Sequence, residues 1–318
     1  MAEAELPFVS VIVPVYNDER RIAGCVEALL AQTYPHDRYE VIVVDNGSTD
    51  ATRAVVGRYP VTLLSETATR GSYAARNAGL RHARGEILAF TDSDCTPAPQ
   101  WLAAGVAAIM AGADLAGGNV RFVFSARPSG AEVCDSISNM QIERNIRERG
   151  VAKTANLFAR ASVVAAIGPF PHGLQSGGDV IWTGRATARG FRLVYAPQAE
   201  VAHPTRRLLE LLKKHYRVGR GQHAIRAARR AEASGTSAAP PGQAAGRRRS
   251  KIGAVLRGFL PDSPQSVRES MRVNQVEGVC SLYRVWLVAW LCQITTTLGS
   301  LSAAGATFAK RQLPYAPE

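Results

Sequence analysis

Four short runs of apolar, mostly β-branched residues alternate with amphipathic segments over the first 90 residues. Strands are predicted at residues 8–15, 39–44, 61–64 and 86–90, with the first, second and fourth buried and the third short. Apolar positions at helical spacing predict helices between them, at residues 19–32, about 50–58 and 72–84. This alternation predicts an α/β fold whose mostly parallel sheet carries helices on both faces, with ligands bound beyond the carboxyl ends of the strands.

The pattern continues less regularly after residue 100. Further strands are predicted at residues 116–122, 156–159, 191–195 and 199–202, with helices at 101–111, from 160 to about 168, at 179–188 and at 206–229. Residues 123–150 are expected to be a looser region. We therefore expect one α/β domain over 1–230, a low-complexity basic linker over 231–252 and a helical, membrane-associating region over 253–318.

Polar residues follow three of the predicted strands. Asn17 follows the first strand, Asp45 ends the second, and Asp92 and Asp94 follow the fourth. Side chains two residues apart in an extended segment point the same way, so the two acids can aim at one point. A pair of carboxylates suits a hard divalent cation, although solvated acids at a strand end are the simpler alternative.

The segment 285–309 contains 25 residues without a charge, flanked by Arg284 and by Lys310-Arg311. Its length is sufficient to cross a bilayer, but Gln293 and Thr295 to Thr297 weaken it as a spanning helix. We expect a helix that lies at the membrane surface. A full span and a helix packed on a soluble domain are the alternatives.

The chain has 318 residues, a formal net charge of +12 and five cysteines without CxxC spacing. Much of the positive charge lies in 204–273, and no nucleic-acid-binding module accompanies it, so we expect an anionic membrane surface and no nucleic acid as its partner. The cysteines are predicted to be free thiols. Met1 to Pro7 lack a secretory pattern, so we expect a cytoplasmic protein, peripheral or monotopic at the inner face of the plasma membrane.

Several short motifs, in order and at characteristic spacing over about residues 8–220, resemble the family-2 glycosyltransferases, which are inverting enzymes of the GT-A fold. They are Val11-Ile12-Val13-Pro14-Val15-Tyr16-Asn17, Val43-Val44-Asp45-Asn46-Gly47-Ser48-Thr49-Asp50, Ala75-Arg76-Asn77-Ala78-Gly79, Thr91-Asp92-Ser93-Asp94, Gly177-Gly178-Asp179, and Gly190 to Pro197 followed by His203. The chain contains neither GxGxxG nor GxxxxGK[ST], so neither the usual dinucleotide-binding fold nor a P-loop is supported.

The resemblance implies a nucleoside-diphosphate sugar donor, with UDP the first nucleotide to consider, and a glycan or lipid-linked acceptor. It implies a cation, Mg²⁺ or Mn²⁺, held by Asp94 and His203. The residues that it places around the donor are Pro14, Tyr16, Asn17, Asp45, Arg76, Asp92 and Ser93. Asn156 and Trp182 are the candidates for acceptor contacts.

The resemblance also implies that Asp179 is the base that takes the proton of the acceptor hydroxyl. The family often has Glu-Asp where this chain has Gly178-Asp179, and a helix N-cap is the alternative role for Asp179. Processive members carry Gln-x-x-Arg-Trp downstream, whereas His215 to Gly221 lack that Trp, so we expect the addition of one sugar.

Two other functions stay open on the sequence. A nucleotidyltransferase also combines an α/β nucleotide pocket with metal-binding acids. It would have a glycine-rich basic loop after the first strand, where this chain has Tyr16-Asn17-Asp18-Glu19. A relative that binds sugar nucleotides but has lost catalysis is the second alternative. Hydrolysis of a donor distinguishes the enzyme from the binding protein.

Overall fold

The computed structural model describes residues 6–171, 173–174, 176–235 and 256–312, which form two compact units. Unit 1 comprises Met1–Val123, Met140–Leu174 and Gly178–Pro204, and unit 2 comprises Phe124–Asn139, Gln175–Gly177 and Thr205–Glu318. Most of the predicted linker at 231–252 lies outside the described residues. The predicted division into three regions stays a prediction.

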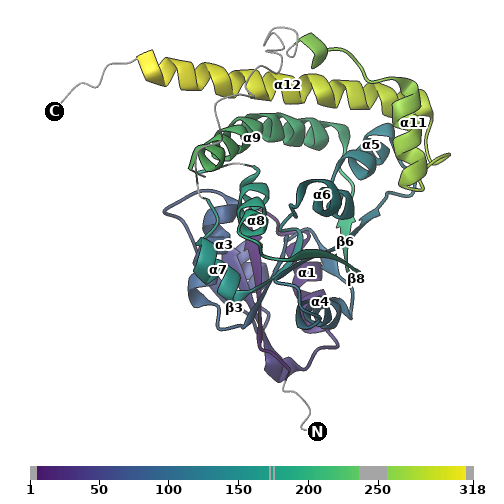
Figure 1. Ribbon diagram of the computed structural model, residues 1–318. Coiled ribbons are helices and arrows are strands. Elements are labelled where there is room, and N and C mark those ends of the chain that lie inside the picture. The colour runs from purple at the N-terminus through teal and green to yellow at the C-terminus, as the bar shows by residue number, and fades with distance from the viewer. Residues whose placement is uncertain (1–5, 172, 175, 236–255, 313–318) are drawn as a thin grey trace. The chain divides into compact units, whose positions relative to one another are not determined.

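Unit 1 is built on one eight-stranded sheet (Figure 1). Its strands are β1 Val9–Val15, β2 Tyr39–Asp45, β3 Thr62–Ser65, β4 Ile87–Thr91, β5 Thr96–Pro97, β6 Leu115–Val123, β7 Asn156–Arg160 and β8 Leu193–Pro204. Their order is β3-β2-β1-β4-β7-β6-β8-β5. The first four strands and the β6–β8 pair are parallel, whereas β7 is antiparallel to both β4 and β6, and β5 to β8. The mostly parallel sheet that the sequence predicts is confirmed.

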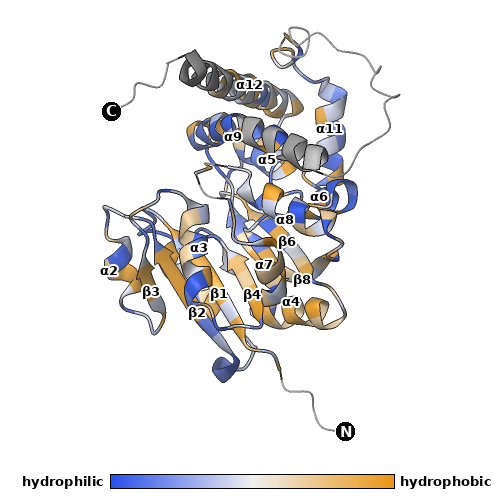
Figure 2. Ribbon diagram, turned by 60° about the vertical axis from the view of Figure 1, so that its left-hand side comes forward, coloured by the Kyte–Doolittle hydropathy of each residue, from blue (hydrophilic) through white to orange (hydrophobic). Residues whose placement is uncertain are grey.

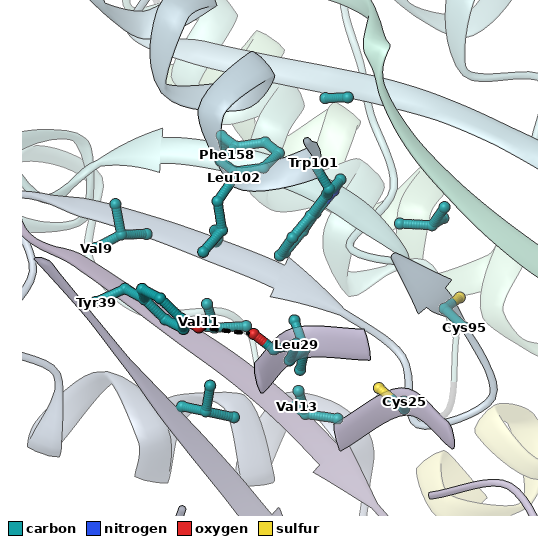
Figure 3. Close-up of a cluster of buried hydrophobic side chains, with 14 of the residues drawn as sticks. Val9, Val11, Val13, Cys25, Leu29, Tyr39, Cys95, Trp101, Leu102 and Phe158 are labelled. Carbon is teal, nitrogen blue, oxygen red and sulfur yellow. Dashed lines mark hydrogen bonds between the residues drawn. The ribbon is translucent and has the colours of Figure 1, made fainter. Parts of the chain in front are cut away.

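Helices cover both faces of this sheet because alternate residues of each buried strand point to opposite sides. Val9, Val11 and Val13 of β1 belong to one apolar cluster with α1 (Ile22–Leu30), α2 (Thr52–Val56) and α4 (Trp101–Met110). Figure 3 shows Trp101 and Phe158 in this cluster, together with Cys25 and Cys95. Ile12 of β1 belongs to the opposite cluster, with α3 (Ser72–His82), α7 (Ala161–Ile167) and α8 (Gly178–Ala188). The apolar strands between these layers are the orange ribbons of Figure 2.

Two expectations about the middle of the chain are wrong. The strands predicted at 191–195 and 199–202 form the single strand β8. Its pairing with β6 jumps from Ala196 opposite Gly118 to Glu200 opposite Asn119, so the intervening residues bulge without ending the strand. The region 123–150 contains two helices, α5 (Gly130–Ser138) and α6 (Ile142–Arg149). A capping box, Ser129 with Glu132, marks the start of α5 and is visible in the sequence.

In the described part of the chain, the helices of unit 2 are α5, α9 (Leu208–Gly235), α11 (Pro264–Val273) and α12 (Leu282–Gln312). Helices α9 and α12 approach each other closely through glycines. A Cβ atom on Gly219 would overlap the backbone oxygen of Thr296, and one on Gly299 would overlap that of Tyr216. Apolar side chains from all four elements form the core of this unit, among them Val133, Leu211, Met271 and Val285. The five cysteines of the chain are free, as predicted.

Candidate active site

The polar residues that follow β1, β2 and β4 lie at one edge of the sheet. These three strands are adjacent and parallel, and Val15 at the end of β1 pairs with Asp45 at the end of β2. Asn17 adopts a left-handed conformation with φ of 49°, which an asparagine tolerates better than most residues. Its Oδ1 accepts a hydrogen bond from the Thr49 N–H at 2.8 Å, which ties the two loops together. The predicted convergence of these strand ends is confirmed.

Asp45 is buried in the loop that follows its own strand. Its carboxylate accepts hydrogen bonds from the N–H groups of Gly47 and Ser48 and lies 3.4 Å from Nη1 of Arg53. Pro14 is buried within β1, whereas half of the Tyr16 surface is exposed. This arrangement places a fixed carboxylate beside an exposed aromatic ring at the strand ends.

Asp92 forms an ion pair with the buried guanidinium of Arg76, which comes from α3. Burial raises the pKa of Asp92 above its usual range. The charge of Arg76 opposes this, and the charges of Asp94 and then Asp179 add to it. Arg76 Nε is buried without a hydrogen-bond partner among the described residues. A buried donor without a partner is costly, and an anionic ligand here would satisfy it.

Ser93 lies between the two acids in a turn, closed by the Cys95 N–H on the Asp92 backbone oxygen at 3.0 Å, so the extended segment predicted for Asp92 to Asp94 is wrong. Ser93 Oγ donates a hydrogen bond to Asp18 Oδ2 at 2.6 Å, and Asp18 in turn pairs with Arg21. The structure therefore gives Ser93 a role in holding the loop after β1 against the loop after β4.

Asp94 and His203 lie together, with 3.6 Å between Asp94 Oδ2 and His203 Nε2. Nδ1 of His203 is 2.6 Å from the backbone oxygen of Pro204. A carbonyl oxygen only accepts, so Nδ1 of His203 carries a proton, and Nε2 is the ring nitrogen that faces Asp94. This second bond is the usual way in which a metal-ligating histidine is oriented.

Sequence reasoning did not single out two neighbours of Asp94. Donor atoms of Asp94, Cys95 and His203 all lie within 4.8 Å of one another, and Arg21 Nη1 is 3.9 Å from Asp94 Oδ2. The position of Cys95 next to Asp94 was visible in the sequence, but its distance from His203 was not. A carboxylate and an imidazole that face each other form a donor set suited to a divalent cation.

Asp179 lies in the first turn of α8 and is half-buried. Its Oδ1 accepts hydrogen bonds from the Val180 N–H at 2.9 Å and from the Tyr73 hydroxyl at 3.0 Å. The charge of Asp179 contributes to the raised pKa of Asp92, so the two carboxylates share one electrostatic environment. Tyr73 is a further residue that the sequence did not reveal.

Asn156 and Trp182 are fully buried. The Asn156 amide donates to the backbone oxygens of Asn119 and Ala199 and accepts from Trp101 Nε1, while Trp182 Nε1 donates to the Gly168 oxygen. Both side chains hold unit 1 together at these positions. Their contact with an acceptor stays a prediction.

Comparisons with known proteins agree with this architecture. Residues 10–156 match the model of the family described as glycosyl transferase family 2. The chain is 43% identical to glycosyltransferase AglE of Haloferax volcanii over 304 residues, which cover 93% of this chain and 96% of that protein.

Two solved structures show the same fold. One is the mannosyltransferase PcManGT from Pyrobaculum calidifontis in complex with GDP-Man and Mn²⁺, with a TM-score of 0.62 and 22% identity over 93% of this chain and 88% of that one. The other is S. aureus TarS 1–349 in complex with UDP-GlcNAc, with a TM-score of 0.53 and 19% identity over 93% and 92%. The predicted GT-A fold is thereby confirmed, and with the near full-length likeness to AglE it follows that this chain belongs to glycosyltransferase family 2.

Proposed function

We propose that this glycosyltransferase moves one sugar from a nucleoside-diphosphate sugar to a hydroxyl of a glycan or lipid-linked acceptor, with inversion at the anomeric carbon. The observation that carries this proposal is the geometry of the site: Asp94 faces His203, and α3 holds Asp92 through Arg76 and Asp179 through Tyr73. Solved proteins of the same fold hold GDP-Man or UDP-GlcNAc, which supports a nucleotide sugar as the donor.

The donor nucleoside would lie against Pro14, Tyr16, Asn17 and Asp45. A carboxylate facing the imide N–H of uracil makes a favourable hydrogen bond, so UDP is the first nucleotide to test. Arg76 would face the diphosphate with the buried Nε that has no hydrogen-bond partner within the described part of the chain. Asp92 would lie near the ribose, and Ser93 would keep the loop that carries both acids in place.

Asp94 and His203 would hold a divalent cation. When bound, the cation neutralises negative charge on the departing diphosphate. Carboxylates suit both Mg²⁺ and Mn²⁺, whereas imidazole is a better ligand for the transition metals, so this pair favours Mn²⁺. The Mn²⁺ in the related fold of the Pyrobaculum protein is consistent with that preference.

Inversion takes place in a single displacement. As the acceptor oxygen forms its bond to the anomeric carbon, the bond to the diphosphate oxygen breaks and its electron pair leaves with the diphosphate. Asp179 takes the proton of the acceptor hydroxyl in the same step. Its half-buried carboxylate lies at the helix start, where one oxygen is already fixed by two hydrogen bonds.

An Asp179→Asn variant tests this proposal. A panel of UDP-glucose, UDP-GlcNAc and GDP-mannose with Mn²⁺ first identifies a donor by hydrolysis or thermal shift. The variant is expected to lose about 10³-fold or more of the turnover while it still binds the nucleotide, because only the base is removed. Asp37→Asn, at an exposed position, is the matched control.

Full activity of the Asp179→Asn protein would exclude Asp179 as the base. A wild-type protein that binds nucleotides but hydrolyses none of the donors would instead favour the catalytically inactive alternative.

We further propose that unit 2 docks at the cytoplasmic face of the plasma membrane. Residues Leu282–Ala303 of α12 are apolar and long enough to cross a bilayer, and little of the segment is buried. The polar side chains that weaken it as a membrane helix are bonded within unit 2. Trp290, Gln293 and Thr297, along one side of α12, donate to the backbone oxygens of Phe259, Arg257 and Gly258. A helix whose middle is bonded to another chain segment on one side suits an interfacial position better than a span surrounded by lipid.

The exposed leucines of α12 test the docking surface. Replacing Leu298 and Leu301, both more than 40% exposed, with Glu is expected to reduce flotation with vesicles of phosphatidylcholine and phosphatidylglycerol. Leu209→Glu, at a more exposed leucine of α9, is the control. Unchanged flotation of the Leu298/Leu301 variant would exclude this face as the lipid contact.

A further inference from the structure

Tyr73, in the first turn of α3, lies next to Asp179 in unit 1. Its hydroxyl is 3.0 Å from Asp179 Oδ1, although the two residues are 106 positions apart in the sequence. We propose that Tyr73 is a positioning residue that fixes the carboxylate of Asp179 for proton transfer, an inference that rests on the proposed role of Asp179 as the base.

Two neighbours hold the ring of Tyr73 in place. It packs against Phe170 at 6.2 Å between ring centres, and the Phe170 backbone is itself bonded in both directions to the Asn77 amide of α3. The second neighbour is Gly178, where a Cβ atom would come within 2.8–3.0 Å of three atoms of the Tyr73 ring. The glycine before Asp179 therefore leaves the room that the tyrosine occupies.

The hydroxyl can act only as a donor to Asp179. Burial, and then the nearby charge of Asp179, raise the pKa of Tyr73 above its usual range, so the phenol stays protonated. Asp179 Oδ1 accepts this bond together with the bond from the Val180 N–H. Two donors on Oδ1 fix the plane of the carboxylate, and we assign Oδ2 to the acceptor hydroxyl. Tyr73 keeps its own proton throughout, while the acceptor proton passes to Asp179.

Tyr73 also links the base to the donor side of the site. Arg76 follows it by three residues on the same face of α3, with its guanidinium carbon 5.7 Å from the centre of the Tyr73 ring. Arg76 in turn pairs with Asp92. One helix face thus sets the position of the Asp92 carboxylate and that of Asp179, which fixes the two relative to each other.

Tyr73→Phe tests the inference because it removes the hydroxyl and keeps the ring. With the donor found in the panel above and Mn²⁺, we expect kcat to fall about ten- to a hundredfold while the donor KM stays within about twofold. Loss of a donor to a carboxylate favours its protonated form, so the acid limb of the pH–rate profile should move to higher pH. Gly178→Ala, which displaces the ring, should also lower kcat.

Tyr34→Phe is the matched control, since it removes another buried hydroxyl of unit 1, one that donates to the Pro7 oxygen at 2.6 Å. It should lower the melting temperature without changing kcat or the acid limb. If Tyr73→Phe behaves like this control while Asp179→Asn is inactive, the positioning role is wrong and the base assignment stands. If Asp179→Asn is fully active, the proposed base itself is wrong.

Discussion

Each of the two units contains a pair of neighbouring acidic residues, and the surroundings of the two pairs act on the ionised carboxylates in opposite ways. In unit 1, Asp92 and Asp94 lie close enough for each charge to disfavour the other, and burial with this repulsion raises the pKa of Asp92 in spite of Arg76. In unit 2, burial also works against the ionised forms of Glu132 and Asp135. There the surrounding donors outweigh it, and the pKa of both carboxyls is lowered, for Glu132 to about 2.

The hydrogen-bond partners of Glu132 and Asp135 explain why their pKa values are lowered and that of Asp92 is raised. Asp135 is fully buried, yet it accepts from the Arg206 N–H, the Arg206 guanidinium and Lys214 Nζ, all within 3.3 Å. Glu132 closes the capping box of α5 and binds Ser125, Ser129 and Thr205. Such acids stabilise the fold, whereas acids that repel each other at a sheet edge cost stability and are typical of functional sites. We therefore expect substitutions in the two pairs to affect different properties.

Among substitutions in these two pairs of acids, the largest effect is expected for Asp94→Ala in unit 1. Activity should fall by about 10²-fold or more and the response to Mn²⁺ should disappear, because one of the two proposed ligands is gone. The melting temperature should stay the same or rise, since Asp92 loses a repulsive neighbour. Turnover and Mn²⁺ binding by electron paramagnetic resonance measure the first effect, and thermal unfolding the second. Asp92→Ala should instead raise the donor KM first. If Mn²⁺ still activates the Asp94→Ala protein, the proposed functional role of this acid pair is wrong.

The second effect is expected for Asp135→Ala in unit 2. The substitution leaves Arg206 and Lys214 without their shared buried partner, which costs about 3–5 kcal/mol of folding free energy. Hydrogen exchange of the α5 and α9 amides at increasing denaturant concentration reports on this unit. Glu269→Ala, which removes an exposed ion pair of α11, should change the free energy by less than about 0.5 kcal/mol. Equal effects of the two substitutions would show that Asp135 is not a structural anchor.

The smallest effect is the pH dependence of the α5 cap. The pKa of Glu132 is lowered to about 2 in the folded protein from an ordinary value near 4.5. Ionised Glu132 therefore stabilises unit 2 fully above about pH 4.5, and this contribution, on the order of 2 kcal/mol, is lost as the pH falls toward 2. Hydrogen exchange of the α5 amides in the wild type and in Glu132→Gln measures it. The two proteins should differ at pH 6 and converge near pH 2, and a constant difference would contradict the assignment.

The sequence alone determined most of the sheet edge in unit 1 that carries the proposed donor site. Strands β1, β2 and β4 are buried almost throughout and appear as continuous apolar runs, so their limits are visible. Parallel strands joined by helices end at the same edge, and this rule placed Asn17, Asp45 and the Asp92–Asp94 pair together without any coordinates. The capping box of Ser129 and Glu132 is also a feature of neighbouring residues in the sequence. It marks the start of a helix that the pattern of apolar residues alone did not predict.

Only the tertiary structure decided the features that depend on contacts between distant residues. Strand β7 lies antiparallel between β4 and β6, and β8 continues through a bulge. Both features depend on how the strands pair, which the hydrophobic pattern does not indicate. The bond from Tyr73 to Asp179 joins two helices, and the bonds from α12 to residues 257–259 use polar side chains that the sequence showed only as a defect in an apolar helix. Local sequence records which face of an element is buried. Which partner meets that face is set by packing of the whole chain, and in this protein that packing supplies the contact to the proposed base.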